Sequence, residues 1–294
     1  MPIFTQIMIG MRRITTRISV LIFMLAIVAT NIKAQEIVFE KADSIFIEEI
    51  INRHNAQSYS TTGEKAVAIA TEFIGKDYVA GTLDEHNTEP LFISCSKLDC
   101  TTFVETVLAA ALCSNDDAFT QFCKNLELIR YREGKRGDYT TRLHYISWWI
   151  DDPAKQHIAK EVTSKHHTAT QVLNPNFMST HPSSYKHLKE NPTATEAIAE
   201  LERTFNNKEI KYIPKENIDK VKKEDIKDGD IIAIVTAIDG LDISHIGFAC
   251  WQQDTLHMIH ASSAAGKVIN DQTSLAAYLA KRKNHLGIRV FRAL

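Results

Sequence analysis

The 294-residue sequence lacks the motifs that mark several large classes of protein. It has no glycine-rich phosphate loop, which argues against nucleotide chemistry. It has no Cys-x-x-Cys or His-x-x-x-His pair, and the adjacent His166 and His167 would point apart on a helix or a strand, so the spacing does not favour zinc. No internal repeat or low-complexity tract is visible. We therefore expect a protein without a metal or another cofactor.

Long apolar runs are also scarce, and the main one lies near the N-terminus. Three arginines precede an apolar run at 18–29, and a small-residue cleavage site follows at 32–34. This pattern is typical of a secretory signal peptide, because the run is too short to span a membrane comfortably. We expect cleavage of residues 1–34 and export of the mature chain, periplasmic or secreted, without an integral membrane segment. Met8 and Met11 leave the true start codon open.

The mature chain has fewer basic than acidic residues. Cleavage removes four basic residues and no acidic residue, which changes the formal net charge from −2 to −6 and argues against nucleic acid as a partner. Residues 35–294 are enough for one large domain with an ample core, and we expect a monomer. The five cysteines are an odd number, which leaves at least one free thiol in an oxidising compartment: Cys95, Cys100, Cys113, Cys123 and Cys250. A bond between Cys95 and Cys100 would silence a nucleophile.

Cys100 stands at the start of a predicted helix. Apolar residues recur at helical spacing from Phe103 to Leu112, and Asp99 is a favoured N-cap residue. The unpaired N–H groups and the dipole of a helix N-terminus stabilise negative charge, so we expect a lowered pKa for this thiol. The alternative is a small buried hydrophobic residue, as most cysteines are.

Three strands are predicted near the C-terminus, at 228–235, 242–249 and 255–261. Because alternate side chains share one face of a strand, only one of His257 and His260 can face the helix. His245 could serve as the base for a thiol and His260 could orient its imidazole, whereas Gly247 would allow close approach of a backbone or a substrate. Ordinary strand histidines that bond backbone carbonyls are the alternative.

Several short motifs follow one another along the chain: Tyr78-Val79-Ala80-Gly81, Asp99-Cys100, Gly229-Asp230, His245-Ile246-Gly247 and His260-Ala261. In this order they resemble the NlpC-type cell-wall cysteine peptidases, which have a papain-like fold. The resemblance implies an α+β fold in which the nucleophile helix packs on an antiparallel sheet that ends at 288–291. It also implies that Cys100 is the nucleophile, His245 the base and His260 the third polar residue, with Tyr78 near the oxyanion and the substrate.

The sequence departs from the family pattern in two places. Thr101 and Thr102 follow the cysteine where the family has Ser-Gly, and 145 positions separate Cys100 from His245. We therefore expect a large insertion, at about 117–225, within a single catalytic domain. The combination is similar to a divergent branch of N-acetylmuramoyl-L-alanine amidases, which implies muropeptides as substrates.

The predicted insertion contains a segment rich in aromatic residues. Rings stack on sugars and arginine binds carboxylates, so we expect this segment to form a binding wall, with Arg142, His144, Tyr145 and Trp148 as its candidates. Aromatic stripes more often belong to the core, and a charged residue in such a run needs a partner. From about 156 to 223 the chain becomes polar, which favours loops with short helices such as 195–205. Residues 36–55 are expected to form an amphipathic helix.

The function implied by the resemblance is hydrolysis of the amide between N-acetylmuramic acid and L-alanine. Cys100 would attack the carbonyl, and His245 would protonate the leaving amine. The backbone N–H of Cys100 and the Tyr78 hydroxyl would stabilise the oxyanion. Further candidates for contact with substrate are Asp99, Thr101 and Ser244. The alternatives are a papain-like endopeptidase or acyl transferase acting on the stem peptide, and a catalytically silent wall-binding module.

Overall fold

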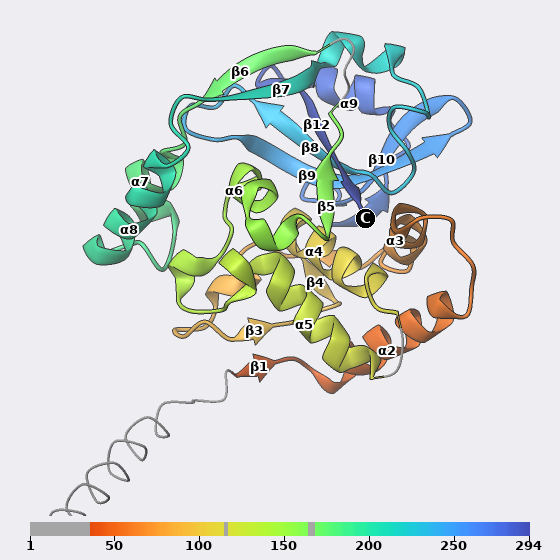
Figure 1. Ribbon diagram of the computed structural model, residues 1–294, viewed down its shortest axis with the longest axis horizontal. Helices are drawn as coiled ribbons and strands as arrows, with labels where there is room; N and C mark the ends of the chain where they lie inside the picture. The colour runs from red at the N-terminus through yellow and green to blue at the C-terminus, as the bar shows by residue number, and fades with distance from the viewer. Residues whose placement is uncertain (1–35, 115–116, 164–167) are drawn as a thin grey trace, which may run out of the picture. The chain divides into compact units, whose positions relative to one another are not determined.

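A ten-stranded mixed sheet forms the centre of the computed structural model, which describes residues 36–114, 117–163 and 168–294 (Figure 1). The predicted signal peptide lies outside the described residues, as do His166 and His167. The strand order is β4-β2-β11-β10-β9-β8-β12-β7-β6, and β5 also pairs with β12. The bounds are β2 (Asp77–Tyr78), β4 (Lys97–Leu98), β5 (Ala159–Glu161), β6 (Ala169–Leu173), β7 (Lys208–Pro214), β8 (Ile231–Thr236), β9 (Ile243–Gln252), β10 (Thr255–Ser262), β11 (Lys267–Asn270) and β12 (His285–Ala293).

The sheet is antiparallel from β11 to β6, as expected, but the prediction of a wholly antiparallel sheet is wrong. β2 pairs with β4 in parallel, with Tyr78 opposite Leu98. A separate two-stranded sheet, β1 (Ile37–Val38) with β3 (Leu91–Phe92), is also parallel. Each of these strands has two residues, too few to show the alternation of apolar and polar side chains by which a strand is recognised.

Helices cover both faces of the sheet. In Figure 1, α3, α4 and α5 gather on one side of β8, β9, β10 and β12, and α9 lies on the other side. The sequence predicted α4 from its apolar spacing. It also predicted a helix over residues 36–55, of which Lys41–Asn55 is observed as α2, whereas Ile37–Val38 form strand β1 and not helix. The helices are α2 (Lys41–Asn55), α3 (Thr62–Thr71), α4 (Cys100–Ala111), α5 (Ala118–Arg130), α6 (Ile146–Asp151), α7 (Phe177–Thr180), α8 (Pro192–Arg203) and α9 (Leu275–Ala280). Short 3₁₀ helices connect them: η1 (Thr82–Asp84), η2 (Arg132–Gly134), η3 (Tyr139–Thr141), η4 (Pro153–Lys155), η5 (Pro182–Ser184) and η6 (Lys215–Lys220).

Alternating side chains of the central strands fill two different cores. Phe248 and Ile259 belong to the core that contains α4, where the Phe103 ring lies 5.8 Å from the Phe248 ring. Ala249 and Met258, one position away on the same strands, belong to the core beneath α9. Strands buried on both faces read as continuous apolar runs, which explains why β8 consists of six buried residues.

Much of the predicted insertion joins the main sheet. β6 and β7 form an antiparallel pair, β7 pairs with β12, and α5 packs beside α4. The expectation of loops with short helices between 156 and 223 is therefore wrong for this strand pair, although α8 matches the helix expected at 195–205. Residues Ile37–Leu294 form one compact unit. No helix among the residues described is long and apolar enough to cross a membrane.

The predicted Gly229-Asp230 turn anchors the start of β8. Gly229 has φ +80°, and a Cβ at this position would lie 1.8 Å from the carbonyl oxygen of Gly63 in α3, so only glycine fits. The buried Asp230 carboxylate accepts two hydrogen bonds from the Arg292 guanidinium, at 2.8 and 2.7 Å. The turn thus ties together α3, β8 and β12.

Candidate active site

Cys100 is the first residue of α4, and its position is fixed by a capping box. The Asp99 Oδ1 accepts a hydrogen bond from the Thr102 backbone N–H at 2.8 Å, and the Asp99 N–H donates to Thr102 Oγ1 at 2.9 Å. Such a reciprocal pair satisfies two N–H groups at the start of the helix. Thr102, at the position where the NlpC-type family has glycine, is therefore a capping residue. The Asp99 carboxylate stabilises the start of the helix, so the predicted role of Asp99 in substrate contact has no support from its hydrogen bonds.

His245 of β9 and His260 of β10 are in direct contact. The His245 Nε2 lies 2.6 Å from the His260 Nδ1, and the two rings are nearly perpendicular, at 85°. Gly247 makes the contact possible, because a Cβ there would come within 2.8 Å of the His260 Cβ. The close approach expected at this glycine is thus made by the neighbouring strand. His257, the alternative on β10, instead bonds the Asp271 carbonyl oxygen at 2.9 Å.

A third residue, Asp271, continues this chain of contacts and was not predicted from the sequence. Its Oδ2 lies 3.5 Å from the His260 Nε2. Asp271 directly follows β11, a strand that the sequence analysis did not identify, and a lone aspartate in a polar turn carries no signal of its own. The carboxylate favours a proton on His260 Nε2, which leaves Nδ1 as an acceptor for the His245 Nε2–H. In this arrangement the His245 Nδ1 is unprotonated and can act as a base.

Cys100 and His245 line one cavity of about 190 Å³. The capping box supplies the cysteine at a helix N-terminus, and β9 supplies the histidine. Two more predicted residues, Thr101 and Ser244, line the same cavity, and Ser244 is exposed. The structure thus places a thiol, an imidazole and a helix N-terminus around one space, which is the set of groups needed for acyl transfer through a thioester.

Tyr78 lies close to this cysteine through the parallel pairing of β2 with β4. It stands opposite Leu98, two residues before Cys100, and the Val79 N–H donates to the Leu98 carbonyl at 3.0 Å. Burial raises the pKa of Tyr78, and nearby negative charge on Cys100 and Asp99 would raise it further. The hydroxyl therefore stays protonated at neutral pH and can donate a hydrogen bond.

Tyr278 of α9 packs against both histidines and was also missed by the sequence analysis. Its ring lies 6.2 Å from the His245 ring, with 25° between the two planes, and 5.6 Å from the His260 ring in an edge-on contact. The short helix α9 has few residues from which a periodic pattern could be recognised. Tyr278 covers the histidine pair and helps to exclude water from it.

Burial keeps both members of the cysteine and histidine pair neutral. It raises the pKa of the Cys100 thiol to about 11, with a further contribution from the Asp99 carboxylate, and it lowers the pKa of His245 to about 3. The lowered thiol pKa expected from the helix N-terminus is therefore wrong in direction, because the loss of hydration outweighs the helix dipole. His245 must take the thiol proton as the sulfur attacks.

Alkylation should reveal this neutral state. We expect the rate of Cys100 labelling by iodoacetamide to rise about tenfold per pH unit from pH 7 to 10, because the thiolate fraction increases in that proportion below a pKa of about 11. Peptide mass spectrometry after timed labelling would measure the rate at each cysteine. A plateau reached by pH 7 would instead demonstrate a preformed thiolate and contradict the prediction.

Buried neutral histidines also predict acid sensitivity of the fold. Burial lowers the pKa of His144 to about 4, as it lowers that of His245 to about 3, whereas unfolded histidine titrates near 6.5. Between these values the unfolded chain binds more protons, so the free energy of unfolding falls as the pH drops, by up to about 1.4 kcal/mol per histidine per pH unit. Urea unfolding at pH 7 and pH 5 would measure the loss of free energy of unfolding, which should be smaller in His144→Gln. Equal free energies of unfolding of the wild-type protein at the two pH values would refute the prediction.

Arg142 does not offer its guanidinium to a substrate, contrary to the prediction. It is buried and donates to both Glu89 oxygens, at 2.6 and 2.8 Å, to Asp84 Oδ1 at 2.6 Å and to the Leu83 carbonyl at 2.7 Å. The predicted need for a partner is met by carboxylates that lie more than 50 positions earlier in the chain. Arg142 ties the segment that precedes α6 to the loop after β2.

The aromatic segment is mostly core as well. Trp148 is 1 % exposed and packs with Tyr145 and Tyr139, so the prediction that it stacks on a sugar is wrong. The Tyr145 hydroxyl donates to the Glu202 carboxylate of α8 at 2.6 Å. His144 bonds the Tyr139 carbonyl oxygen through Nε2 at 2.9 Å. Of the four predicted residues, His144 and Tyr145 line the cavity with Cys100.

Loss of the Arg142 side chain should destabilise the protein. We expect Arg142→Met to lower the free energy of unfolding by about 3–5 kcal/mol, because it leaves the buried Glu89 carboxylate without its cationic partner. Urea denaturation would measure the change. Arg203→Met provides the control, since the exposed Arg203–Glu196 pair contributes at most about 1 kcal/mol. Equal losses in the two variants would contradict a structural role for Arg142.

All five cysteines lie in the described part of the chain and are free thiols. Cys95 is buried, and its backbone N–H donates to Asp43 Oδ1 at 2.8 Å. The bond between Cys95 and Cys100 that would silence the nucleophile is therefore not formed. Burial raises the pKa of Cys95 and, to about 12, that of Cys113, so neither thiol competes as a nucleophile at neutral pH.

Comparison with known proteins identifies an amidase-like hydrolase and the family to which it belongs. Residues 68–288 match the model of the AmiA-like family, described as N-acetylmuramoyl-L-alanine amidase-like. The chain therefore belongs to the AmiA-like family. No curated protein matches it.

Three solved structures are similar to this chain. An N-acetylmuramoyl-L-alanine amidase from Bacteroides uniformis is 37 % identical, with a TM-score of 0.75 over 79 % of this chain and 99 % of that one. A protein from Bacteroides fragilis, for which xylanase is the suggested activity, is 43 % identical, with a TM-score of 0.73 over 77 % of this chain and 99 % of its own. A Legionella pneumophila protein, 24 % identical, shares the fold, with a TM-score of 0.64 over 86 % and 95 % of the two chains.

Proposed function

We propose that this protein is a cysteine amidase that hydrolyses the amide between N-acetylmuramic acid and L-alanine in peptidoglycan or its fragments. The observation that carries the proposal is the shared cavity of Cys100 and His245, with the contacts from His245 through His260 to Asp271 behind it. Membership of the AmiA-like family supports the choice of bond. The order of the motifs supports a papain-like, NlpC-type active site.

The proposed reaction begins with a neutral thiol. His245 Nδ1 takes the Cys100 proton while the sulfur attacks the lactyl carbonyl carbon, and the oxyanion accepts hydrogen bonds from the Cys100 backbone N–H and the Tyr78 hydroxyl. When the C–N bond breaks, His245 returns this proton to the alanine nitrogen. His245 then takes a proton from water, whose oxygen attacks the thioester, and the sulfur leaves and regains a proton. The products are the muramic acid carboxylate and the free stem peptide.

The second histidine supports this cycle electrostatically. When His245 becomes an imidazolium in the transition state, its Nε2–H donates to His260, which in turn faces the Asp271 carboxylate. The low pKa of His245 means that it returns its proton readily to the leaving amine. Positive charge on His245 thus exists only while the substrate is reacting.

The alternative of a glycosidase, raised by the Bacteroides fragilis protein, is not supported by this cavity. Hydrolysis of a glycosidic bond needs two carboxyl groups, about 5–10 Å apart, on either side of the bond. Among the described residues that line the cavity, Asp242 supplies the one carboxylate. Its oxygens accept hydrogen bonds from the Ser147 and Ile243 N–H groups, both at 2.8 Å, so it is committed to holding the backbone.

Product analysis tests the proposed bond. Purified muropeptides, with and without linked glycan, would be incubated with the mature protein and separated by mass spectrometry. Release of the muramic acid sugar together with the intact stem peptide is the expected result. Cleavage within the stem peptide would retain the cysteine chemistry and replace the amidase by an endopeptidase. Binding without cleavage of any fragment would favour a silent wall-binding module.

The place of action is proposed from the N-terminal sequence. The arginines before the apolar run at 18–29 and the cleavage site at 32–34 support export, so we expect the mature enzyme in the periplasm or outside the cell. The muropeptides would then be met outside the cytoplasmic membrane, during turnover or recycling of the wall. Signal-peptide processing is tested by N-terminal sequencing of the protein from a periplasmic extract, where a start at Gln35 is expected.

A further inference from the structure

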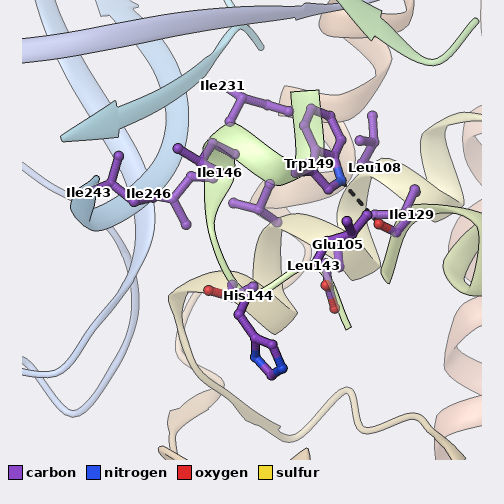
Figure 2. Close-up of a pocket in the computed structure, with 12 residues that line it drawn as sticks. Glu105, Leu108, Ile129, Leu143, His144, Ile146, Trp149, Ile231, Ile243 and Ile246 are labelled. Carbon is purple, nitrogen blue, oxygen red and sulfur yellow. Dashed lines mark hydrogen bonds between the residues drawn. The ribbon is translucent and has the colours of Figure 1, made fainter. Parts of the chain in front are cut away.

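A second, apolar cavity lies along the nucleophile helix (Figure 2). One side of α4 supplies four of its lining residues, Thr101, Val104, Glu105 and Leu108, which recur three and four positions apart. This row starts at the residue next to Cys100 and continues for two helical turns. Isoleucines from α6, β8 and β9 close the opposite side, as Figure 2 shows for Ile146, Ile231 and Ile246.

This cavity adjoins the one that holds the thiol. Thr101, His144, Ile243 and Ile246 line both cavities. The apolar cavity is the smaller, about 60 Å³ against about 190 Å³. A group that enters it from the active site must therefore be small and must lie within a short distance of the reacting carbonyl.

Three of the polar groups in its wall already have partners. The Glu105 carboxylate accepts from the buried Arg130 Nε at 2.7 Å, and the Trp149 Nε1–H donates to the Ile129 carbonyl oxygen at 3.1 Å, the contact dashed in Figure 2. His144 is engaged with the Tyr139 carbonyl. The ion pair neutralises the carboxylate, so the cavity selects for an apolar group rather than for a cation.

We propose that this cavity is a specificity pocket for one small aliphatic substituent beside the scissile amide. The inference rests on the proposed function, and two groups of that substrate have the required chemistry: the methyl of the lactyl ether, on the acyl side, and the side chain of the first amino acid, on the amine side. Burial of one methyl group in a fitted pocket changes kcat/KM by about 10-fold or more, and a branched side chain that exceeds the pocket is rejected.

The test compares substrates that differ at one of these two groups. One series carries glycine, alanine, 2-aminobutyrate or valine after the muramic acid, and a second has the lactyl methyl removed. We expect kcat/KM to fall at least about tenfold when the methyl that occupies the pocket is deleted, and again when alanine is replaced by valine if the amine side is the source. Whichever series responds identifies the source.

Variants of Val104 link the effect to this cavity. Val104→Ala widens the pocket and should reduce the discrimination against the larger substrates, whereas Val104→Ile narrows it and should increase that discrimination. The exposed Ile45 of α2 provides the control, and Ile45→Phe should leave the order of substrates unchanged. Equal kcat/KM values across both series would refute the proposed specificity pocket but would leave the proposed amidase activity intact. The specificity pocket would also be refuted if folded Val104 variants kept the wild-type order of substrates.

A binding measurement covers the case in which no substrate is cleaved or the Val104 variants do not fold. Muropeptides labelled with ¹³C at the lactyl or alanine methyl would be bound to Cys100→Ala, and nuclear Overhauser effects to the methyl groups of Leu108 and Ile129 would be measured. Such contacts from one labelled methyl are expected. Their absence with bound ligand, or the absence of binding, would overturn the proposal. If the wild-type protein cleaves no substrate but the methyl contacts are observed, the proposed function is refuted and the pocket is retained.

Discussion

Replacement of Cys100 by alanine should lower the rate of amide cleavage by at least about 10⁴-fold while the protein remains folded. The thiol is the one group in its cavity that can form the thioester, and its removal leaves only the oxyanion donors and binding to accelerate the reaction. The rate would be followed as release of stem peptide by liquid chromatography. The melting temperature of the variant should stay close to that of the wild type, because the substitution removes only the sulfur atom and leaves the hydrogen bonds of the capping box in place.

Two further variants make this result specific to the nucleophile. Cys250→Ala, on β9 five positions beyond His245, removes another partly exposed thiol and should leave the rate nearly unchanged. Cys100→Ser keeps the shape but replaces the thiol by a far weaker nucleophile, and should resemble the alanine variant. A Cys100→Ala protein with more than about 1 % of the wild-type rate would show that Cys100 does not carry the reaction.

Replacement of His260 by phenylalanine should cost about 10³- to 10⁴-fold in kcat with a much smaller change in KM. The variant removes the acceptor that lies 2.6 Å from His245 Nε2, so the tautomer with a free Nδ1 is no longer favoured and the imidazolium loses its stabilising partner. His260 acts through His245 and is a positioning residue. Its substitution should therefore also alter the acid limb of the pH–rate profile, which a purely structural role would leave in place.

Conservative variants separate these effects from a loss of packing. His260→Asn retains a carbonyl acceptor and should recover part of the rate. His257→Gln changes a buried histidine on the same strand that bonds the Asp271 backbone, and should retain most of the activity. An unchanged pH–rate profile in His260→Phe, or equal losses in the His257 and His260 variants, would refute the orienting role.

The parts of the site that could be predicted from the sequence depend on local patterns. Asp99 before a run of apolar residues at helical spacing identifies the start of α4, and the alternation along β10 separates His257 from His260. Both signals lie within short runs of neighbouring residues. The juxtaposition of α4 with β9 required the resemblance, because nothing local connects Cys100 to a histidine 145 positions away.

The parts that could not be predicted depend on tertiary contacts. The apolar and aromatic surroundings of Arg142 indicate that it needs a partner, but not that Glu89 meets the need and leaves no donor for a substrate. The direction of the Cys100 pKa shift depends on how deeply neighbouring segments bury the thiol, which the helix dipole alone cannot tell. β6 was missed because its side chains are mostly exposed or half-buried, so its composition is that of a loop.

The pairing of β12 has a consequence for how the molecule assembles. This strand joins β8 to both β7 and β5, and Phe291 pairs with Glu161 across 130 positions of chain. Contacts between distant residues form slowly, because a long loop must first be closed. The helices and the β8–β10 meander can each form from neighbouring segments. Cys100 and His245 meet only when these two parts pack together, because 145 positions separate them. Residues 208–214 are fixed when β12 pairs with β7. We therefore expect folding intermediates in which α4 and the β8–β10 meander are formed but the catalytic groups are not yet assembled.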